Sequence, residues 1–467
     1  MNRREGQALY HLFLVFAGFC LAVNGVAAYW QVVRSSALLE DPRNPQLRLS
    51  AALPRGGILS ADGEVLVWSV PEGGRRYRRE YRGPTGLAAA VGYLSPRYGA
   101  SGLEAAYDSH LRGATAESWV ARLLAAGRSG WRRVPPDLRT TLRSRVQRAA
   151  ERAMAGRRGA VVALNPQTGE ILALVSLPGF DPNRVDQEWA SLRRRRDSPL
   201  LNRALAGLYP PGSVFKPAVA LAALETGQTR PEEEFVCLGE RTVRGQTIAD
   251  LGGEVHGRLD LTTAMAVSCN YVFSGLAMRL SPADLARRTA QYGLLAPAQV
   301  GLPAKAGHFP DPARLEQEEL AQLGIGQGAL LLTPFALARY AAMLANGGRV
   351  VEPYLVRGLG YPGARAVPLR VPAAARWRQA ADPAAVALVN RLLERVVTAG
   401  TGWRARVAGI PVAGKTGSAE NPLGEPHAWF IGFAPAVAVA VVVENGGLGG
   451  TVAAPVAREV IAAAVGR

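Results

Sequence analysis

A run of about twenty apolar residues near the N-terminus, Leu9–Ala28, most constrains how this chain folds. A segment of that length and composition crosses a bilayer core, where only a helix satisfies its own backbone hydrogen bonds. Arg3 and Arg4 precede the run, and basic residues favour the cytoplasmic side. We therefore expect a single-pass membrane anchor with a cytoplasmic N-terminus and everything after Trp30 outside the cytoplasm.

A cleaved signal peptide is the competing interpretation of the same run. The run is long for a signal peptide, and residues 27–30 make a weak cleavage site, whereas Trp30 is typical of an interfacial anchor. An uncleaved anchor is favoured.

The remaining composition indicates a folded chain of two or three domains, because 467 residues contain 48% hydrophobic and 19% charged residues. The net charge is +17, yet no zinc spacing, basic helix or aromatic-basic pattern indicates nucleic-acid binding. An arginine-rich composition or an anionic surface accounts for the charge. Only three of the 54 basic residues are lysines: Lys216, Lys305 and Lys415.

The three cysteines, Cys20, Cys237 and Cys269, show no C-x-x-C or histidine spacing, so no metal site is predicted. Whether Cys237 pairs with Cys269 stays open, since that depends on the fold.

The chain changes character at Gly159. Residues 160–164 and 170–175 read as a strand hairpin, 437–443 as a closing strand and 453–465 as a final helix, with helices between. This order predicts an α+β fold with helices packed on an antiparallel sheet. The expected parts are a cytoplasmic tail (1–8), a transmembrane anchor (9–28), a small mixed α/β pedestal (31–158) and a C-terminal domain (159–467). Within the pedestal, a hairpin around Asp62-Gly63 and a helix over 137–154, with arginines on one face, are expected.

The first chemical motif is S-x-x-K, formed by Ser213 and Lys216. Pro217 indicates a helix that begins close to Ser213, and residues three apart share a helix face. A serine hydroxyl becomes a good nucleophile only when a neighbouring base takes its proton. A desolvated lysine can be that base because burial lowers its pKa. Arginine cannot be the base, because it does not deprotonate in proteins. Alone, the pair could be a helix cap beside a chance lysine.

The second motif, Ser268-Cys269-Asn270, follows a helical run over 262–267. Ser268 could relay a proton and Asn270 could hold a substrate carbonyl. A helix-capping pair is the simpler alternative.

The third motif is Lys415-Thr416-Gly417 followed by Ser418, after a strand-like segment at 410–413. A glycine in a strand allows a ligand to approach the backbone closely. Lys415 offers a cation and Thr416 a hydroxyl to a substrate carboxylate, although an ordinary strand end would look similar.

The order S-x-x-K, S-x-N, K-T-G is typical of β-lactamases and penicillin-binding proteins. The chain resembles class B penicillin-binding proteins, the monofunctional peptidoglycan DD-transpeptidases of the FtsI and PbpA type, over nearly its whole length. The short pedestal is similar to that of compact actinobacterial members. Further stretches that carry the resemblance are Arg55-Gly56-Gly57-Ile58, Gly102-Leu103-Glu104, Gly326-Gln327-Gly328, Gly400-Thr401-Gly402 and residues 427–433.

The resemblance implies a role for each motif residue. Lys216 takes the proton of the nucleophile Ser213, Ser268 relays it to the leaving amine, and Asn270 orients the stem peptide. Lys415 and Thr416 bind the terminal carboxylate, and Gly417 and Ser418 also belong to the substrate-binding strand. The backbone N–H groups of Ser213 and Ser418 form the oxyanion hole.

The resemblance also implies the partners of the chain. These are peptidoglycan stem peptides and nascent glycan strands, β-lactams as inhibitors and a SEDS-type membrane glycosyltransferase, with no metal or organic cofactor and no nucleic acid. A DD-carboxypeptidase or β-lactamase-like hydrolase and a non-catalytic β-lactam sensor or division scaffold are the alternatives, and no room exists for a second, glycosyltransferase domain before Gly159.

Overall fold

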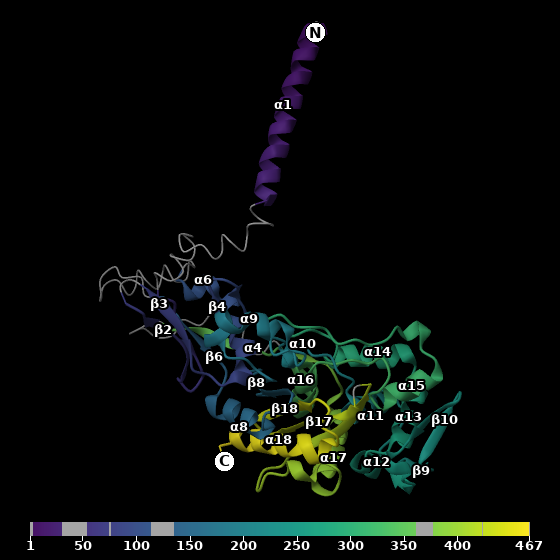
Figure 1. The fold of residues 1–467 in the computed structure, drawn as a ribbon. Coiled ribbons are helices and arrows are strands. Elements are labelled where there is room, and N and C mark those ends of the chain that lie inside the picture. Colours follow the sequence, from purple (N-terminus) through teal and green to yellow (C-terminus); the bar gives the residue numbers. More distant parts are fainter. Residues whose placement is uncertain are drawn as a thin grey trace.

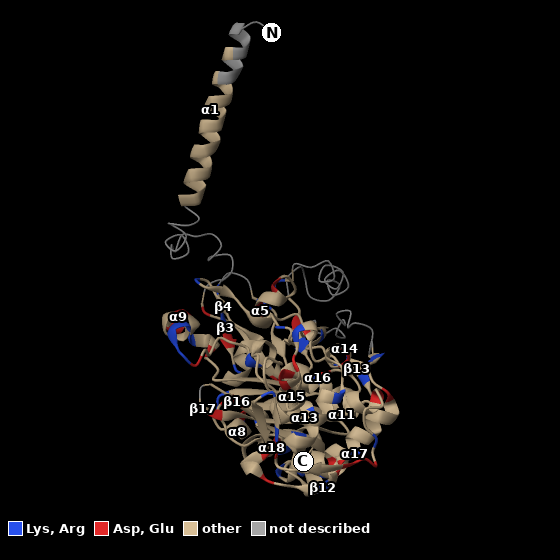
Figure 2. Ribbon diagram, turned by 90° about the vertical axis from the view of Figure 1, so that its right-hand side faces the viewer, with Lys and Arg blue, Asp and Glu red and all other residues tan. Residues whose placement is uncertain are grey.

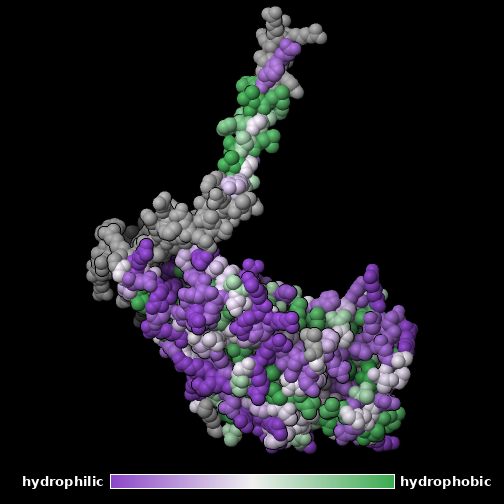
Figure 3. All heavy atoms as spheres, viewed as in Figure 1, coloured by the Kyte–Doolittle hydropathy of each residue, from purple (hydrophilic) through white to green (hydrophobic). Residues whose placement is uncertain are grey.

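A computed structural model describes residues 3–29, 54–73, 76–113, 135–360, 377–422 and 424–466 (Figure 1). The predicted interfacial anchor Trp30 and parts of the predicted pedestal lie outside these ranges. The N-terminal helix α1 (Arg3–Ala28) stands apart from the globular body. Its stretch His11–Ala28 is the one described helix long and apolar enough to cross a membrane, and none of it is buried. Figure 3 shows this apolar helix against the largely polar surface of the body.

A five-stranded antiparallel sheet forms the centre of the larger, C-terminal part. Its strands, in spatial order, are β16 (Ala413–Asn421), β17 (Gly424–Ala434), β18 (Val437–Val443), β7 (Gly159–Leu164) and β8 (Ile171–Leu177). Strand β18 occupies the residues predicted for it, and β8 extends two residues beyond its prediction. Strand β16 lies at the edge of the sheet, so one side of its backbone is open to other segments.

Helices cover both faces of this sheet, which explains why β7 and β18 are apolar throughout. Val161 and Val441 point to the face covered by α8 (Ser144–Met154) and α18 (Gly449–Ala464). Their neighbours Val162 and Val442 belong to the larger core on the opposite face, where α16 (Pro334–Ala345) packs. Side chains alternate across a strand, so each strand supplies both cores.

A second sheet lies nearer to α1 and combines distant parts of the chain. Its spatial order is β14 (Val356–Gly360), β6 (Asp137–Thr140), β1 (Ile58–Leu59), β2 (Val65–Pro71) and β3 (Tyr77–Tyr81). The predicted hairpin is present as β1–β2, with Gly63 in a positive-φ turn. Strand β14 pairs antiparallel with β6, so a strand from late in the chain completes the sheet of the N-terminal part.

Buried charges hold this N-terminal part together. Glu104, fully buried on α5 (Gly102–Ala106), accepts ion pairs from Arg55 at 3.0 Å and Arg79 at 2.7 Å. Both arginine side chains are also buried. Removing Glu104, or removing its arginine partners, would leave a buried charge uncompensated.

The remaining helices and short strands fill the space between the sheets and the far end of the molecule. The helices are α4 (Ala88–Val91), α6 (Asp108–Leu111), α9 (Val185–Arg194), α10 (Arg203–Ala206), α11 (Lys216–Glu225), α12 (Leu261–Val267), α13 (Asn270–Arg279), α14 (Pro282–Gln291), α15 (Gln317–Gly324) and α17 (Pro383–Ala399). The strand pairs are β4 (Leu94–Ser95) with β5 (Gly99–Ala100), β9 (Glu234–Cys237) with β12 (Gly257–Asp260), β10 (Glu240–Val243) with β11 (Gln246–Ala249), and β13 (Arg349–Val351) with β15 (Trp377–Gln379).

Two predicted helix boundaries were wrong. The helix expected over 137–154 begins only at Ser144, because residues 137–140 pair with β1 and β14 as a strand. The final helix begins at Gly449 rather than Ala453 and continues past Pro455. The expected arginine face of α8 is present, since Arg145, Arg148 and Arg152 are exposed.

Charges of both signs are interspersed over the globular body, and basic residues gather at α9 (Figure 2). The predicted α+β architecture is confirmed: an N-terminal apolar helix, a small mixed part and a larger domain with an antiparallel sheet and packed helices.

Candidate active site

Ser213 lies on a tight turn that leads into a buried helix. Residues Gly212–Phe215 form a 3-10 turn, η4, and α11 continues from Lys216 with Pro217 in its first turn. Gly212 has a φ of 57°, in the left-handed region that glycine adopts readily, and its N–H donates to the carbonyl of Gly326 at 2.8 Å. The turn is thereby held from two sides, and the half-buried Ser213 side chain is presented at its surface.

Lys216 points into the protein interior and contacts the second motif. Its ammonium is fully buried and donates to the Ser268 carbonyl at 2.5 Å, the Ser268 hydroxyl at 3.2 Å and Asn270 Oδ1 at 2.6 Å. Burial lowers the pKa of Lys216 to about 7, against the opposing influence of Cys269 and Asp250. A lysine with this pKa is partly neutral near pH 7 and can accept a proton.

The second motif is a bend between two helices. Ser268 ends α12 with a φ of 64°, a left-handed conformation uncommon for serine, and α13 begins at Asn270. The Asn270 amide is fixed at both ends, because Nδ2 donates to the Ala249 carbonyl at 2.7 Å while Oδ1 accepts from Lys216. Backbone conformations of this kind are frequent at functional sites.

The third motif lies on β16, with its open edge beside the serine turn. A Cβ on Gly417 would lie 3.0 Å from Val214 Cγ1 and 3.2 Å from the Pro211 carbonyl, so glycine permits this approach. Lys415 is fully buried and donates to the Thr416 carbonyl at 3.0 Å. Burial, together with the charge of Lys216, holds the pKa of Lys415 well below its usual range.

The two hydroxyl-bearing residues of this strand are also held by neighbours. Thr416 Oγ1 lies 2.6 Å from Thr401 Oγ1. The Ser418 hydroxyl accepts from the Gly449 N–H at 3.2 Å. All eight candidate residues named from the sequence therefore lie on three neighbouring segments, η4–α11, the bend at 268–270 and β16.

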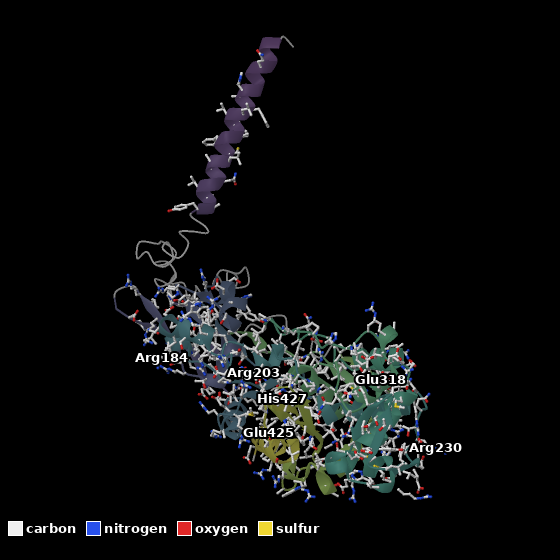
Figure 4. All side chains as sticks on the ribbon, turned by 45° about the vertical axis from the view of Figure 1, so that its right-hand side comes forward. Arg184, Arg203, Arg230, Glu318, Glu425 and His427 are labelled. Atoms are coloured by element: carbon white, nitrogen blue, oxygen red, sulfur yellow. The ribbon has the colours of Figure 1, made fainter. Side chains whose placement is uncertain are left out.

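Sequence reasoning missed the residues that support the serine turn from behind. The Trp429 indole donates to the Pro210 carbonyl at 3.1 Å, and the Tyr209 hydroxyl donates to Glu444 at 2.7 Å. Arg203 pairs with the same Glu444 carboxylate at 2.7 Å, and the ring of His427 lies against Tyr209. Arg203 and His427 are labelled in Figure 4. The only sequence signal for these residues was the family-like stretch at 427–433. That stretch did not indicate that Trp429 contacts Pro210.

It also missed a cluster next to the second motif. One potential ligand atom from each of Cys237, Asp250, His256 and Cys269 lies within 4.8 Å of the other three. Cys237 and Cys269 are free thiols. No local spacing could reveal the cluster, because its members are spread over residues 237–269 and meet only through the fold.

This combination of fold and motifs defines a penicillin-recognising serine acyl-transferase. Residues 159–462 match the family model for the penicillin binding protein transpeptidase domain, and residues 55–129 match that for the penicillin binding protein A dimerisation domain. The chain therefore belongs to the penicillin-binding protein transpeptidase family.

Relatives and solved structures match over most of the chain. The peptidoglycan D,D-transpeptidase PbpA of Mycolicibacterium smegmatis is 35% identical and that of Mycobacterium tuberculosis 36%, each over 94% of this chain and 95% of the relative. The imipenem acyl-enzyme structure of penicillin-binding protein A from M. tuberculosis has a TM-score of 0.80 at 34% identity, covering 89% of this chain and 99% of that one. The predicted family and its D,D-transpeptidase, serine-type acyl-transfer function are confirmed.

Proposed function

We propose that this chain crosslinks peptidoglycan stem peptides through an acyl-enzyme on Ser213, with Lys216 as the base. The observation that carries the assignment is the buried Lys216 amine, three residues after Ser213 and hydrogen-bonded to Ser268 and Asn270. An amine with its pKa lowered to about 7 is suited to take a hydroxyl proton.

In the first half-reaction, Lys216 takes the Ser213 proton as Ser213 Oγ attacks the carbonyl of a stem peptide ending in D-Ala-D-Ala. The bond to the terminal D-alanine breaks, and Ser268 passes a proton to the leaving amine. The hydrogen bond between Lys216 and the Ser268 hydroxyl supports this route, because it joins base and relay directly.

Recognition of the substrate falls to β16. Its open edge lies beside the serine turn, so an extended peptide can pair with it as an added strand. Lys415 and Thr416 bind the terminal carboxylate, with the Thr401 hydroxyl holding Thr416. The backbone N–H groups of Ser213 and Ser418 stabilise the oxyanion, each worth about 3–4 kcal/mol in comparable sites.

In the second half-reaction, an amine from a neighbouring stem attacks the acyl-enzyme carbonyl and forms the crosslink. The attacking amine gives up its proton through Ser268 to Lys216, and Ser213 leaves as the alkoxide and takes that proton from Lys216. Every group named here comes from the protein or its substrates, so the reaction as drawn uses no cofactor.

The assignment is tested by treating full-length protein in detergent with a β-lactam. Intact-mass spectrometry should show one adduct, which peptide mapping should place on Ser213, and Ser213→Ala should abolish it. An adduct on another residue would refute the nucleophile. Incubation with stem peptide and an acceptor amine should yield crosslinked product; release of hydrolysed peptide alone would favour a carboxypeptidase.

The finer cellular arrangement is also a proposal. Helix α1 anchors the chain with its N-terminus in the cytoplasm and the catalytic domain outside, where the lipid-linked wall precursor is polymerised. The unburied, apolar span supports an anchor, and the preceding arginines support this orientation. A reporter enzyme that is active only outside the cytoplasm, fused after Arg467, should be active; an inactive but stable fusion would reverse the topology.

We further propose that a SEDS-type glycosyltransferase is the membrane partner. A structure described as coordinating polymerization and crosslinking by a peptidoglycan synthase complex matches 98% of this chain at 26% identity and a TM-score of 0.74. Replacing α1 with an unrelated apolar helix should leave Ser213 acylation intact but weaken co-purification with the glycosyltransferase. Unchanged co-purification would show that the glycosyltransferase contacts a part of the chain other than α1.

A further inference from the structure

A cavity lies at the end of the body where β9 and β10 meet α13 (Figure 1). Its volume is about 220 Å³. Tyr271, Gly275 and Arg279 line it from one side of α13, because residues four apart share a helix face. Phe235 of β9 and Arg241 of β10 form the facing wall. None of the eight candidate residues of the active site is among the lining residues, whereas two arginines are.

The Arg241 side chain is held against the surface of α13. The central carbon of its guanidinium lies 4.0 Å from the centre of the Tyr271 ring, and Nη2 donates to the Tyr271 carbonyl at 3.4 Å. A Cβ on Gly275 would lie 3.0 Å from the same Nη2, so glycine leaves room for the guanidinium. A guanidinium stacked in this way presents its donors in one plane, which suits a planar anion.

The charges around the cavity leave Arg241 uncompensated. Arg279 pairs with Glu233 at 2.6 Å. Glu234, which also lines the cavity, pairs with Arg258 at 3.4 Å. In the part of the chain that the structure describes, no carboxylate forms an ion pair with Arg241, and its buried Nε has no hydrogen-bond partner. A buried donor without a partner costs free energy that a bound acceptor would recover.

We propose that this cavity binds the carboxylate of a peptide through Arg241, at a site separate from Ser213. A guanidinium fork matches the two oxygens of a carboxylate. One uncompensated positive charge suits a monoanion, whereas the second charge of a phosphate would stay unpaired. The apolar side chains of Phe235, Val272 and Leu276 also line the cavity and would contact the aliphatic part of the same ligand.

The carboxylate belongs to a second peptidoglycan stem peptide. This assignment of the ligand rests on the proposed function, whereas the carboxylate site itself does not. Tyr271 directly follows the motif residue Asn270, so the cavity adjoins the helix that carries the second motif. A glycan strand bears many stem peptides, and one stem held at Ser213 brings its neighbours to a high effective concentration. A weak second contact would therefore retain the strand through both half-reactions.

The test uses full-length protein in detergent whose Ser213 has first been acylated by a β-lactam, so that a peptide can bind only elsewhere. The adduct mass reports on the proposed function separately from the binding that follows. Equilibrium dialysis with acetyl-lysyl-D-alanyl-D-alanine should then show saturable binding of one peptide per chain. The same peptide with a C-terminal amide should bind about tenfold more weakly, because a charge-assisted hydrogen bond is lost.

Variants of Arg241 locate the binding. Arg241→Met keeps the aliphatic stem and removes the charge, so it should weaken binding about tenfold, whether or not Ser213 carries an adduct. Arg241→Lys keeps the charge but lacks the planar fork, so its affinity should lie between the two. Arg244→Met is the matched control and should bind normally, because Arg244 lies in the turn of the same hairpin, outside the cavity, with a side chain 60% exposed.

Competition in the unmutated protein keeps the test independent of variants that fold poorly. At constant ionic strength, acetate should displace the peptide, and inorganic phosphate at the same concentration should displace it less. The proposal would be overturned by an absence of saturable binding, by equal binding of the acid and the amide, by full affinity of Arg241→Met, or by stronger competition from phosphate than from acetate.

Discussion

The indole Nε1 of Trp429 donates a hydrogen bond to the carbonyl of Pro210, 3.1 Å away, and so links β17 to the turn that presents Ser213. Trp429 is fully buried, and its ring also meets that of Tyr209 edge to face at 5.9 Å. Residues outside the three motifs therefore help to hold the turn that carries Ser213.

Trp429→Phe should weaken both stability and acylation. The variant keeps an aromatic ring but leaves the Pro210 carbonyl unsatisfied, which should lower the free energy of unfolding by about 1–3 kcal/mol. Denaturant unfolding and the rate of labelling by a fluorescent penicillin measure the two effects. Trp403→Phe is the matched control, because Trp403 is 54% exposed; equal behaviour of the two variants would contradict the role of the hydrogen bond.

Lys216→Arg should slow acylation of Ser213 by about 10²–10⁴-fold, the usual value of a general-base step. Arginine keeps the positive charge but does not deprotonate in proteins. The rate of β-lactam adduct formation, followed by intact mass, measures the loss. Lys305→Arg changes the exposed lysine outside the motifs and should label at the normal rate. Normal labelling of Lys216→Arg would exclude Lys216 as the base.

The acylation rate should rise with pH through about 7. Lys216 has its pKa lowered to about 7, so its neutral, base-competent form is scarce below that pH and dominant above it. The rate of labelling should be measured at drug concentrations far below saturation, from about pH 5.5 to 8.5. It should rise with a midpoint within about one pH unit of neutrality. A rate that falls across this range would contradict the assignment.

The folding stability should also rise with pH because of Lys216, and over a wider pH range than the acylation rate. The unfolded chain holds the Lys216 proton up to the ordinary pKa of 10.5, whereas the folded chain releases it near 7. Between these values the unfolded state binds more protons, so this residue makes stability rise with pH. Lys216→Met should flatten the dependence of melting temperature on pH from 7 upward, while Lys415, whose pKa is also lowered, contributes a slope of the same sign. An unchanged slope would argue against a desolvated Lys216.

Gly326→Ala should destabilise the serine turn strongly. Gly326 has a φ of 72°, and an added Cβ would lie 2.1 Å from the Gly212 carbonyl oxygen. Left-handed strain and overpacking together should lower the free energy of unfolding by roughly 2–5 kcal/mol and slow acylation. Gly347 has a φ of 61° with nothing within 4 Å of its Cβ position, so Gly347→Ala isolates the strain alone. Equal losses in the two variants would show that the close approach is unimportant.

Much of the architecture was predictable because local patterns carried it. The apolar run at 9–28 could only form a long helix, and the continuous apolar stretches at 160–164 and 437–443 indicated buried strands. Proline at the start of α11 placed the helix that follows Ser213. By contrast, residues 137–140 were expected to be helical, because their pairing with β14 from a distant part of the chain has no local signal.

The sequence by itself determined which residue types are available for catalysis: a serine and a lysine three apart, a second serine near an asparagine, and a lysine-threonine-glycine strand in a chain with three lysines. Only the tertiary structure decided that Lys216 bonds to Ser268 and Asn270, that Trp429 supports Pro210, and that the 237–269 cluster exists. The physical reason is that helix and strand periodicity act over a few residues. Contacts between segments, and the burial that shifts the pKa of Lys216, arise only when separate elements pack around one core.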